Sequence, residues 1–499
     1  MSLQTIPTQL PTIAGGILCA WLLGHLGHLG QAVWNLAFHP LSRIPGPKLA
    51  GATYLPEFYY DVVLGGQYTN RIQKMHADYG PLVRISPNEV HCSDPRFINE
   101  IYAVGGRRRD KPVHQVRGSG TRTALARFFS RAQVARLEPR IEQLVQRLCD
   151  KLLAQRGKGP FNLTTAYSCF SSDVISDYCF GQGFGFLAQP SWEPNFRAPL
   201  YALLKPMFLF RFFPFLAGLS VAASGITQHV SPDMKLLIHT LTVAMPSQIQ
   251  TIKSDHAAGI SSAEQTAFGS LLDSSLPVEE KSVSRLTDEA TALLAAGTET
   301  ISWALTVIAF HLLTKPAVRA QLDKEVRGAT DTNALTWASL EKLPCLGAVI
   351  QEGLRLSYGV SGRTARIAPD ETLVYRGPAG QSYLIPPGFA VGMSSAIIHH
   401  DERAFPDSHA FVPERWLDAQ MQRNLELHRY MLSFSKGSRA CIGMNLAFCE
   451  LYLVLAALLV RVLPHMHLFE TSEWDVRYDH DMFNPMPRAE SLGVRVVIN

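Results

Sequence analysis

The chain has 499 residues, of which 47% are hydrophobic, and its 46 basic and 42 acidic side chains leave a formal net charge of +4. A chain of this length can bury a large core, and a charge balance this even gives no sign of a nucleic-acid partner. Eight cysteines form neither a CxxC pair nor a regular spacing. Reduced thiols in a cytosol-facing protein are therefore expected.

The first 38 residues are predicted to form a membrane anchor. No Asp, Glu, Lys or Arg precedes Arg43, and the stretch from Ile13 to Phe38 is apolar and long enough to cross a bilayer, which needs roughly 20 residues. A cleaved signal peptide and a helix lying in the membrane interface are the alternatives, the latter because of His25 and His28. Basic residues follow the segment at Arg43 and Lys48, so the rest of the chain is predicted to face the cytosol.

Prolines between residues 39 and 50 predict a stiff connector. Residues 51–499 are predicted to form one large domain, mainly α-helical with small β-sheets, because no low-complexity linker or internal repeat divides them. Apolar residues from Leu137 to Leu152 repeat at helical spacing. Strand-like segments lie on both sides of the helical region, and Phe483–Val497 is predicted to close the chain as a hairpin.

The stretch Phe434–Gly443, FSKGSRACIG, places one cysteine in a glycine-punctuated loop before a long apolar segment that is predicted to be helical. A helix N-terminus stabilises a thiolate, which is the form of cysteine that binds metals. Gly437 and Gly443 can take backbone angles closed to other residues, so a flat cofactor could approach closely. Arg439 offers a fork for a carboxylate. Taken alone, Cys441 would more often be an ordinary buried structural cysteine.

This loop resembles the haem-ligand loop of the cytochrome P450 superfamily, whose pattern FxxGxRxCxG is matched by Phe434, Gly437, Arg439, Cys441 and Gly443. The resemblance covers most of the chain. The proline-rich start and the following FYYDVVLGGQY are similar to fungal members of secondary metabolism, particularly the trichodiene-oxygenase type. The resemblance implies the cytochrome P450 fold behind an N-terminal transmembrane helix, with haem b bound through the Cys441 thiolate.

The stretch AGTET at 296–300 lies within a long apolar segment that is predicted to be helical. The Thr300 hydroxyl is expected to donate to the carbonyl of Ala296, and Gly297 weakens the helix beside it, so a local bulge is expected. The resemblance implies that Glu299 and Thr300 relay protons during oxygen activation. A satisfied polar patch on a buried helix is the alternative.

Glu352 and Arg355 are three residues apart, which places both charges on one helix face. Together with Arg415 of the later PERW stretch, they resemble the buried ExxR and PER network of the family, whose role is structural. A surface ion pair of little energetic weight is the alternative.

The resemblance also nominates residues around the cofactor. Three cations would bind the haem propionates: Arg122, Arg366 and Arg439. Four residues are expected to line the substrate pocket: Leu293, Ala296, Ser361 and Gly362. The stretch MFLFRFFPFL between Pro206 and Leu216 is too short to span a membrane. It is predicted to be an access lid that dips into the bilayer and admits hydrophobic substrates, and a buried core segment is the alternative.

These features predict an oxidoreductase that inserts one oxygen atom of O₂ into a C–H or C=C bond of a hydrophobic small molecule, a terpenoid or polyketide intermediate. The resemblance implies that electrons come from NADPH through a separate NADPH-cytochrome P450 reductase, with cytochrome b5 as a further partner. The chain itself has no convincing GxGxxG motif. The expected location is the endoplasmic reticulum membrane, single-pass, with the catalytic domain in the cytosol. Two alternatives are a haem-thiolate isomerase or dehydratase that needs no external electrons, and a membrane protein that holds haem or lipid without turnover.

Overall fold

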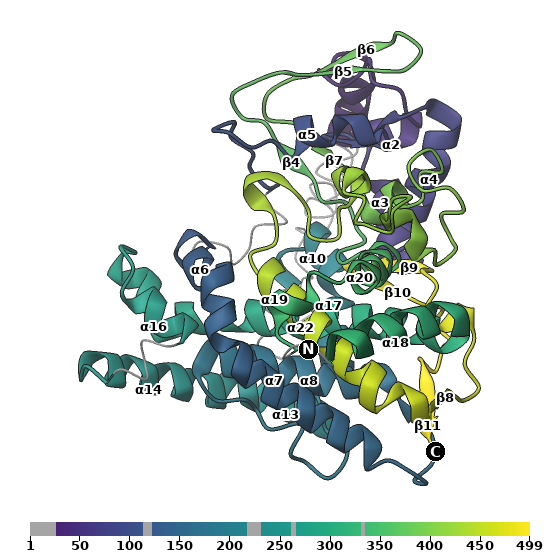
Figure 1. The fold of residues 1–499 in the computed structure, drawn as a ribbon. Helices are drawn as coiled ribbons and strands as arrows, with labels where there is room; N and C mark the ends of the chain where they lie inside the picture. Colours follow the sequence, from purple (N-terminus) through teal and green to yellow (C-terminus); the bar gives the residue numbers. More distant parts are fainter. Residues whose placement is uncertain (1–25, 113–121, 217–230, 261–265, 331–334) are drawn as a thin grey trace, which may run out of the picture.

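The computed structural model describes residues 26–112, 122–216, 231–260, 266–330 and 335–499. The strands and short helices of the N-terminal region gather at one end of the molecule, and the long helices fill the other (Figure 1). The architecture is mainly α-helical with small β-sheets, which confirms the predicted fold class.

Five long helices build the core. They are α7 (Arg131–Leu153), α8 (Leu163–Phe180), α17 (Val283–Thr314), α20 (Pro344–Ser357) and α22 (Met444–Arg461). The central helix α17 starts where the Ser282 side chain accepts a hydrogen bond from the Arg285 amide, an N-cap that satisfies one of the first free amides. It crosses α8 at Gly297, where an added Cβ would lie 2.7 Å from the Ile175 side chain. Gly297 therefore serves close helix packing.

Other described helices, most of them shorter, connect the core to the periphery. They are α2 (Lys48–Ala52), α3 (Leu55–Phe58), α4 (Tyr68–Tyr79), α5 (Ile98–Ile101), α6 (Arg122–Phe128), α9 (Arg197–Leu204), α10 (Met207–Phe212), α13 (Pro232–His239), α14 (Met245–Ala257), α16 (Ala267–Leu272), α18 (Pro316–Thr330), α19 (Trp337–Leu340) and α21 (Ser395–Ile398). Two π-helical turns are η1 (Tyr59–Val63) and η4 (Thr240–Ala244), and two 3₁₀ turns used below are η6 (Pro413–Trp416) and η8 (Gly437–Arg439).

The largest sheet has the order β1 (Leu82–Ser86), β2 (Glu89–Cys92), β7 (Ala390–Gly392) and β4 (Arg366–Ile367). Only the β2–β7 pair in it is parallel. A second sheet has the order β3 (Phe161–Asn162), β11 (Arg495–Ile498) and β8 (Met466–Leu468). Two antiparallel pairs complete the set: β5 (Leu373–Arg376) with β6 (Ser382–Ile385), and β9 (His480–Met482) with β10 (Asn484–Met486).

The predicted closing hairpin over Phe483–Val497 is wrong. The chain turns at Phe483, but the two strands of that hairpin are β9 and β10. The last strand, β11, pairs instead with β8 and β3, which come from earlier parts of the chain. Alternating polarity indicates strands, but it does not select the partner when the partner is distant in sequence.

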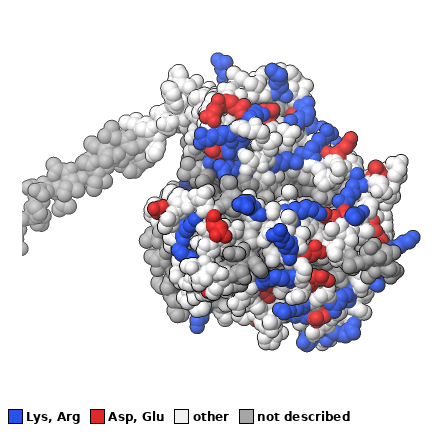
Figure 2. Space-filling model, turned by 60° about the vertical axis from the view of Figure 1, so that its left-hand side comes forward, with Lys and Arg blue, Asp and Glu red and all other residues white. Residues whose placement is uncertain are grey.

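The described part of the predicted anchor, residues 26–37, is helical and mostly exposed. Figure 2 shows this part protruding from the body without any Lys, Arg, Asp or Glu. Residues 1–25 lie outside the described part of the chain. Among described residues, α17 and α22 are long and apolar enough to cross a membrane, but both are mostly buried, so they are core helices.

The predicted connector, residues 39–50, is packed onto the body. Leu41 and Ile44 are buried in the cluster around the largest sheet. The backbone carbonyl of Pro45 accepts a hydrogen bond of 2.8 Å from the Arg84 amide of β1. The expected boundary at residue 50 falls inside α2. The protruding helix therefore leaves the body at a junction fixed by packing.

Candidate functional site

The cysteine loop runs from the end of the 3₁₀ turn η7 (Glu426–Tyr430) to the start of α22, and η8 lies within it. The Cys441 amide donates a hydrogen bond of 2.8 Å to the Phe434 carbonyl, which closes the loop. Phe434 packs on Phe448 of α22, with ring centroids 5.2 Å apart. Cys441 itself is exposed and lies three residues before α22 begins at Met444. The sulfur is thus presented at the positive end of a helix, where a thiolate is stabilised.

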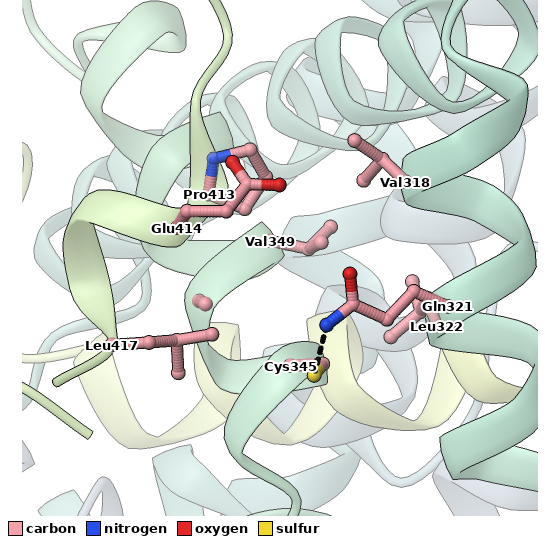
Figure 3. A pocket seen from close by; sticks show the side chains of 9 residues that line it. Val318, Gln321, Leu322, Cys345, Val349, Pro413, Glu414 and Leu417 are labelled. Carbon is pink, nitrogen blue, oxygen red and sulfur yellow. Dashed lines mark hydrogen bonds between the residues drawn. The ribbon is translucent and has the colours of Figure 1, made fainter. Parts of the chain in front are cut away.

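Cys441 differs from the other cysteines of the described chain. Burial raises the thiol pKa of each of them: Cys92, Cys149, Cys169, Cys179, Cys345 and Cys449. The half-buried Cys345 lines a crevice of about 10 Å³ between α18, α20 and η6, where Gln321 donates a hydrogen bond to its sulfur (Figure 3). A thiol held protonated is a poor metal ligand, so the chemistry points to Cys441.

The two glycines of the loop have different roles. Gly437 has φ 74°, and an added Cβ would lie 2.4 Å from the carbonyl oxygen of Tyr102. Only glycine fits there. Gly443 has φ −80°, which any residue adopts, so the expectation of an unusual backbone angle at Gly443 was wrong. An added Cβ there would lie 3.8 Å from the Cys441 sulfur, which is ordinary contact.

Arg366 of β4 reaches the cysteine loop. Its guanidinium donates a hydrogen bond of 3.0 Å to the Ser435 hydroxyl and lies 5.1 Å from the ring centroid of Tyr102. Arg439 is on the same loop, exposed, and lines an open hollow of about 390 Å³ with residues 104–110 and Ser438. The structure therefore brings two of the three expected propionate ligands to the loop. Arg122 begins α6, but its side chain lies outside the described part.

The same hollow contains the basic cluster Arg107–Arg109. Arg109 is buried and ion-paired with Glu371 at 2.6 Å, and Arg107 pairs with Glu371 at 3.0 Å and with Glu100 at 2.7 Å. Arg107 and Arg109 therefore join their loop to the segment that carries Glu371, whereas the Arg108 side chain is mostly exposed.

Glu352 is the centre of a network in which Glu352 and Arg355 are fully buried and Arg415 is nearly so. Its carboxylate accepts hydrogen bonds from Arg355 at 2.8 and 2.9 Å and from Arg415 at 3.2 Å. Glu352 also accepts from two donors that no motif indicated, the Val412 amide at 2.8 Å and the Trp416 indole at 2.9 Å. Removing one partner of such a network would leave an uncompensated buried charge costing about 3 to 5 kcal/mol.

His399 connects this network to the cysteine loop. Its Nδ1 lies 2.8 Å from the Arg355 carbonyl oxygen, and the Leu432 amide donates to its Nε2 at 2.9 Å. The ring is therefore neutral, with the proton on Nδ1. Burial lowers the pKa of His399 to about 3. No motif identifies this residue, because it lies far in sequence from both groups that it joins.

One face of α17 carries the predicted pocket residues Leu293 and Ala296 together with Thr300. Thr300 donates to the Ala296 carbonyl at 2.8 Å, as expected from the sequence. Leu293, Ala296 and Thr300 are all at least partly exposed. The expected bulge is absent, because the described helix is α-helical throughout from Val283 to Thr314; Gly297 is used for packing against α8.

Glu299 is turned away from that face into the protein. It is 2% exposed, and within the described residues neither carboxylate oxygen has a geometrically well-formed hydrogen bond. Burial raises its pKa to about 7, and two groups of α9, the Arg197 charge and the Tyr201 hydroxyl, oppose that rise. A carboxyl with this pKa exchanges protons readily at neutral pH.

Ser361 and Gly362 lie against the β9–β10 hairpin. The buried Ser361 hydroxyl donates to Asp481 at 3.1 Å. An added Cβ on Gly362 would lie 2.4 Å from the other oxygen of Asp481. The Ser361 side chain is therefore engaged by Asp481, and any contact with a ligand would come from this segment's backbone.

Comparisons with known proteins show the family to which the chain belongs. The family model described as Cytochrome P450 matches residues 51–466. A cytochrome P450 monooxygenase of Metarhizium majus, ppzE, is 39% identical over 444 residues, covering 82% of this chain and 93% of the relative. N-acetyltryptophan 6-hydroxylase ivoC of Emericella nidulans is 37% identical over 488 residues, covering 93% of this chain and 94% of the relative.

A solved structure of a cytochrome P450, CYP102L1, covers 87% of this chain and 95% of its own with a TM-score of 0.64 at 19% identity, so the fold is shared. The family model and these relatives place the chain among the haem-dependent oxidoreductases of the monooxygenase class. The chain belongs to the cytochrome P450 family, among the fungal members of secondary metabolism. The residues fit the haem that this family binds: an exposed sulfur at a helix start, a glycine that lets the loop fold close to Tyr102, and a buried arginine at the loop.

Proposed function

We propose that the protein is a haem-thiolate monooxygenase that inserts one oxygen atom of O₂ into a C–H or C=C bond of a terpenoid or polyketide intermediate. The observation that carries the proposal is Cys441, the one exposed cysteine among the described residues, just before α22 in a loop that His399 connects to the largely buried charge network. The curated relatives named above support the class of reaction. The narrower likeness to trichodiene oxygenase is part of the proposal.

Each residue has a defined task in this proposal. Cys441 holds the haem iron, and Arg366, Arg439 and Arg122 bind its propionates. When bound, the haem would supply the redox chemistry in which O₂ takes up two electrons and two protons, so that one oxygen atom goes to the substrate and the other leaves as water. Phe434 and Gly437 stabilise the conformation of the cysteine loop. The network of Glu352, Arg355 and Arg415 holds this loop against α20.

Proton delivery is the task of α17. Glu299 takes up and releases protons near neutral pH because burial raises its pKa to about 7. Thr300, which is less buried than Glu299, donates its hydroxyl hydrogen bond to the Ala296 carbonyl. Leu293 and Ala296 of the same face, together with the segment at Ser361 and Gly362, line the space for an apolar substrate.

Electrons are proposed to come from NADPH through a separate NADPH-cytochrome P450 reductase, with cytochrome b5 as a possible second donor. The proposed location is the endoplasmic reticulum membrane, with the anchor at residues 1–38 and the catalytic domain in the cytosol. Exposed apolar side chains on residues 26–38 and on the predicted lid support a bilayer contact; they include Leu29, Trp34, Phe38, Phe213 and Phe215.

Spectroscopy tests the ligand. Reduced wild-type protein treated with carbon monoxide should show the red-shifted Soret band of a thiolate ligand, and Cys441→Ala should not. Cys345→Ala is the matched control and should keep the band. A wild-type protein that binds haem without this band would refute the assignment.

Activity separates the alternatives. With reductase and a hydrophobic panel, substrate-dependent NADPH consumption is expected. Turnover without NADPH and oxygen would favour an isomerase or dehydratase, and haem binding without any turnover would favour a carrier. The panel should include N-acetyltryptophan beside terpenes and polyketides, because a relative acting on N-acetyltryptophan is 37% identical to this chain.

A further inference from the structure

The predicted lid helix α10 docks on the N-terminal part of the body. Phe212 meets the ring of Phe58 of α3 edge-on, with centroids 5.2 Å apart, and Phe213 lies 6.1 Å from the same ring. Met207 and Phe213 remain exposed. Aromatic contact alone would hold a six-residue helix only weakly.

A charged contact lies beside the aromatic one. Nη2 of Arg211, in α10, is 3.0 Å from Glu57 of α3 and 3.0 Å from Glu89 of β2. Glu57 is 1% exposed and Glu89 is 6% exposed. A single nitrogen of the lid thus bridges two buried carboxylates on two different elements. Buried pairs of this kind are strongly destabilised when one partner leaves, because the other charge stays behind in a region of low dielectric.

The same carboxylates continue toward the substrate segment. Arg363 donates to Glu57 at 3.1 Å and to Asp61 at 2.7 Å, and it directly follows Ser361 and Gly362. Asp61 is held by the π-helical turn η1, a type of turn that is frequent at functional sites. The lid and the pocket-lining segment are therefore joined by one continuous chain of buried charges.

We propose that Arg211 is the latch of the substrate access route. Moving α10 away from the body breaks both ion pairs of Arg211, so these pairs set the rate at which hydrophobic ligands enter and leave. The inference rests on the proposed function in one respect, that α10 covers the route to the haem. The ion pairs themselves stand on the geometry.

Ligand kinetics test the latch. In stopped-flow binding of 4-phenylimidazole to the ferric holoenzyme, Arg211→Ala should raise both the association and the dissociation rate by about tenfold or more. Glu89→Gln should act in the same direction, and the double variant should add little, because both single changes break one contact. Arg211→Lys, which keeps the charge, should lie nearer to wild type.

Arg327→Ala is the matched control. Arg327 forms an ion pair of 2.8 Å with Asp323 on α18, but its side chain is 47% exposed, so its loss should leave both rates within about twofold. If Arg211→Ala loses its fold, Glu89→Gln carries the test. Azole rates that stay at the wild-type level in both variants would overturn the proposal.

Hydrogen exchange provides a readout that needs no haem. In the full chain, the peptide over residues 207–213 should exchange faster in Arg211→Ala and Glu89→Gln than in wild type or Arg327→Ala. Unchanged exchange would overturn the latch. Faster exchange with unchanged azole rates would also overturn it, because α10 would then not control access. A wild type without the thiolate band would refute the proposed function, while exchange would still decide whether Arg211 holds α10.

Discussion

Arg197 and Tyr201 of α9 influence the protonation of Glu299. Burial raises the pKa of Glu299 to about 7, and the Arg197 charge is the largest influence that opposes this rise. The carboxyl therefore stays near the midpoint of its titration at neutral pH. If Glu299 delivers protons, its pKa decides how much of it is ready to donate and how fast it is recharged.

We expect Arg197→Gln to raise the Glu299 pKa by roughly one unit, because the charge that favours the carboxylate is gone. The pH profile of kcat should then move to higher pH by a similar amount. Glu299→Gln should remove this titration from the profile and lower kcat, while KM changes little. Arg327→Gln, on the exposed face of α18, should leave the profile in place. An unshifted profile in Arg197→Gln would contradict the role of the Arg197 charge in setting the pKa of Glu299.

His399 is a second residue whose substitution should change the haem site without direct contact with it. His399→Leu leaves the Leu432 amide and the Arg355 carbonyl without a shared partner, and each unsatisfied buried group costs about 1 to 3 kcal/mol. We expect a lower melting temperature and a smaller haem content, because the cysteine loop loses its tie to α20. His256→Leu, which changes a partly exposed histidine paired with Asp273, should have little effect on either. Full haem content in His399→Leu would show that the tie is dispensable.

The cysteine loop as an element depends on one backbone conformation at Gly437. Gly437→Ala should lower the stability of the fold for two reasons. The position has a positive φ, and the added Cβ would lie 2.4 Å from the Tyr102 carbonyl oxygen. Gly380 is a matched control, because it has φ 81° but nothing within 4 Å of an added Cβ. Gly380→Ala should cost only the backbone strain of about 1 kcal/mol.

We therefore expect Gly437→Ala to lower both the melting temperature and the thiolate band, Gly380→Ala to lower only the melting temperature slightly, and Gly443→Ala to be nearly neutral. The comparison separates steric conflict from backbone strain within one chain. Equal losses in Gly437→Ala and Gly380→Ala would contradict a specific conflict with Tyr102.

Elements with a strong local pattern were predictable from the sequence. The apolar runs that became α17 and α22, and the stripe that became α7, carry their signal within a few turns. Elements that depend on distant partners were not. β11 pairs with β8 and β3, which lie far away in sequence. Gly297 packs closely against Ile175 of α8, and the local sequence shows neither this contact nor the strand pairing.

The site divides in the same way. Motif spacing places Cys441, Glu352, Arg355 and Arg415, and the structure brings the last three together. His399 and the Arg211 contacts join segments far apart in sequence, and only the folded chain shows them. Charge spacing is local information, whereas a buried partner is chosen by topology.

At the scale of the whole molecule, buried neutral histidines make stability depend on pH. Burial lowers the pKa of His311 and His399 to about 3 and that of His76 to about 4. These pKa values lie below the unfolded value of about 6.5. The unfolded chain therefore binds more protons in this range, and stability that is fully present above about pH 6.5 is lost as pH falls toward 4 and then 3.

His311 allows this dependence to be tested one group at a time. Its ring stacks on Phe411 with centroids 4.5 Å apart and is 8% exposed, so His311→Phe keeps the stacking and removes one titrating group. Between pH 6 and 4, the fall in the free energy of unfolding should become shallower by up to about 1.4 kcal/mol per pH unit. Urea titrations at pH 7, 6, 5 and 4 measure it. His256→Phe is the partly exposed control and should keep the wild-type slope, whereas an unchanged slope in His311→Phe would show that His311 is already protonated in the folded protein.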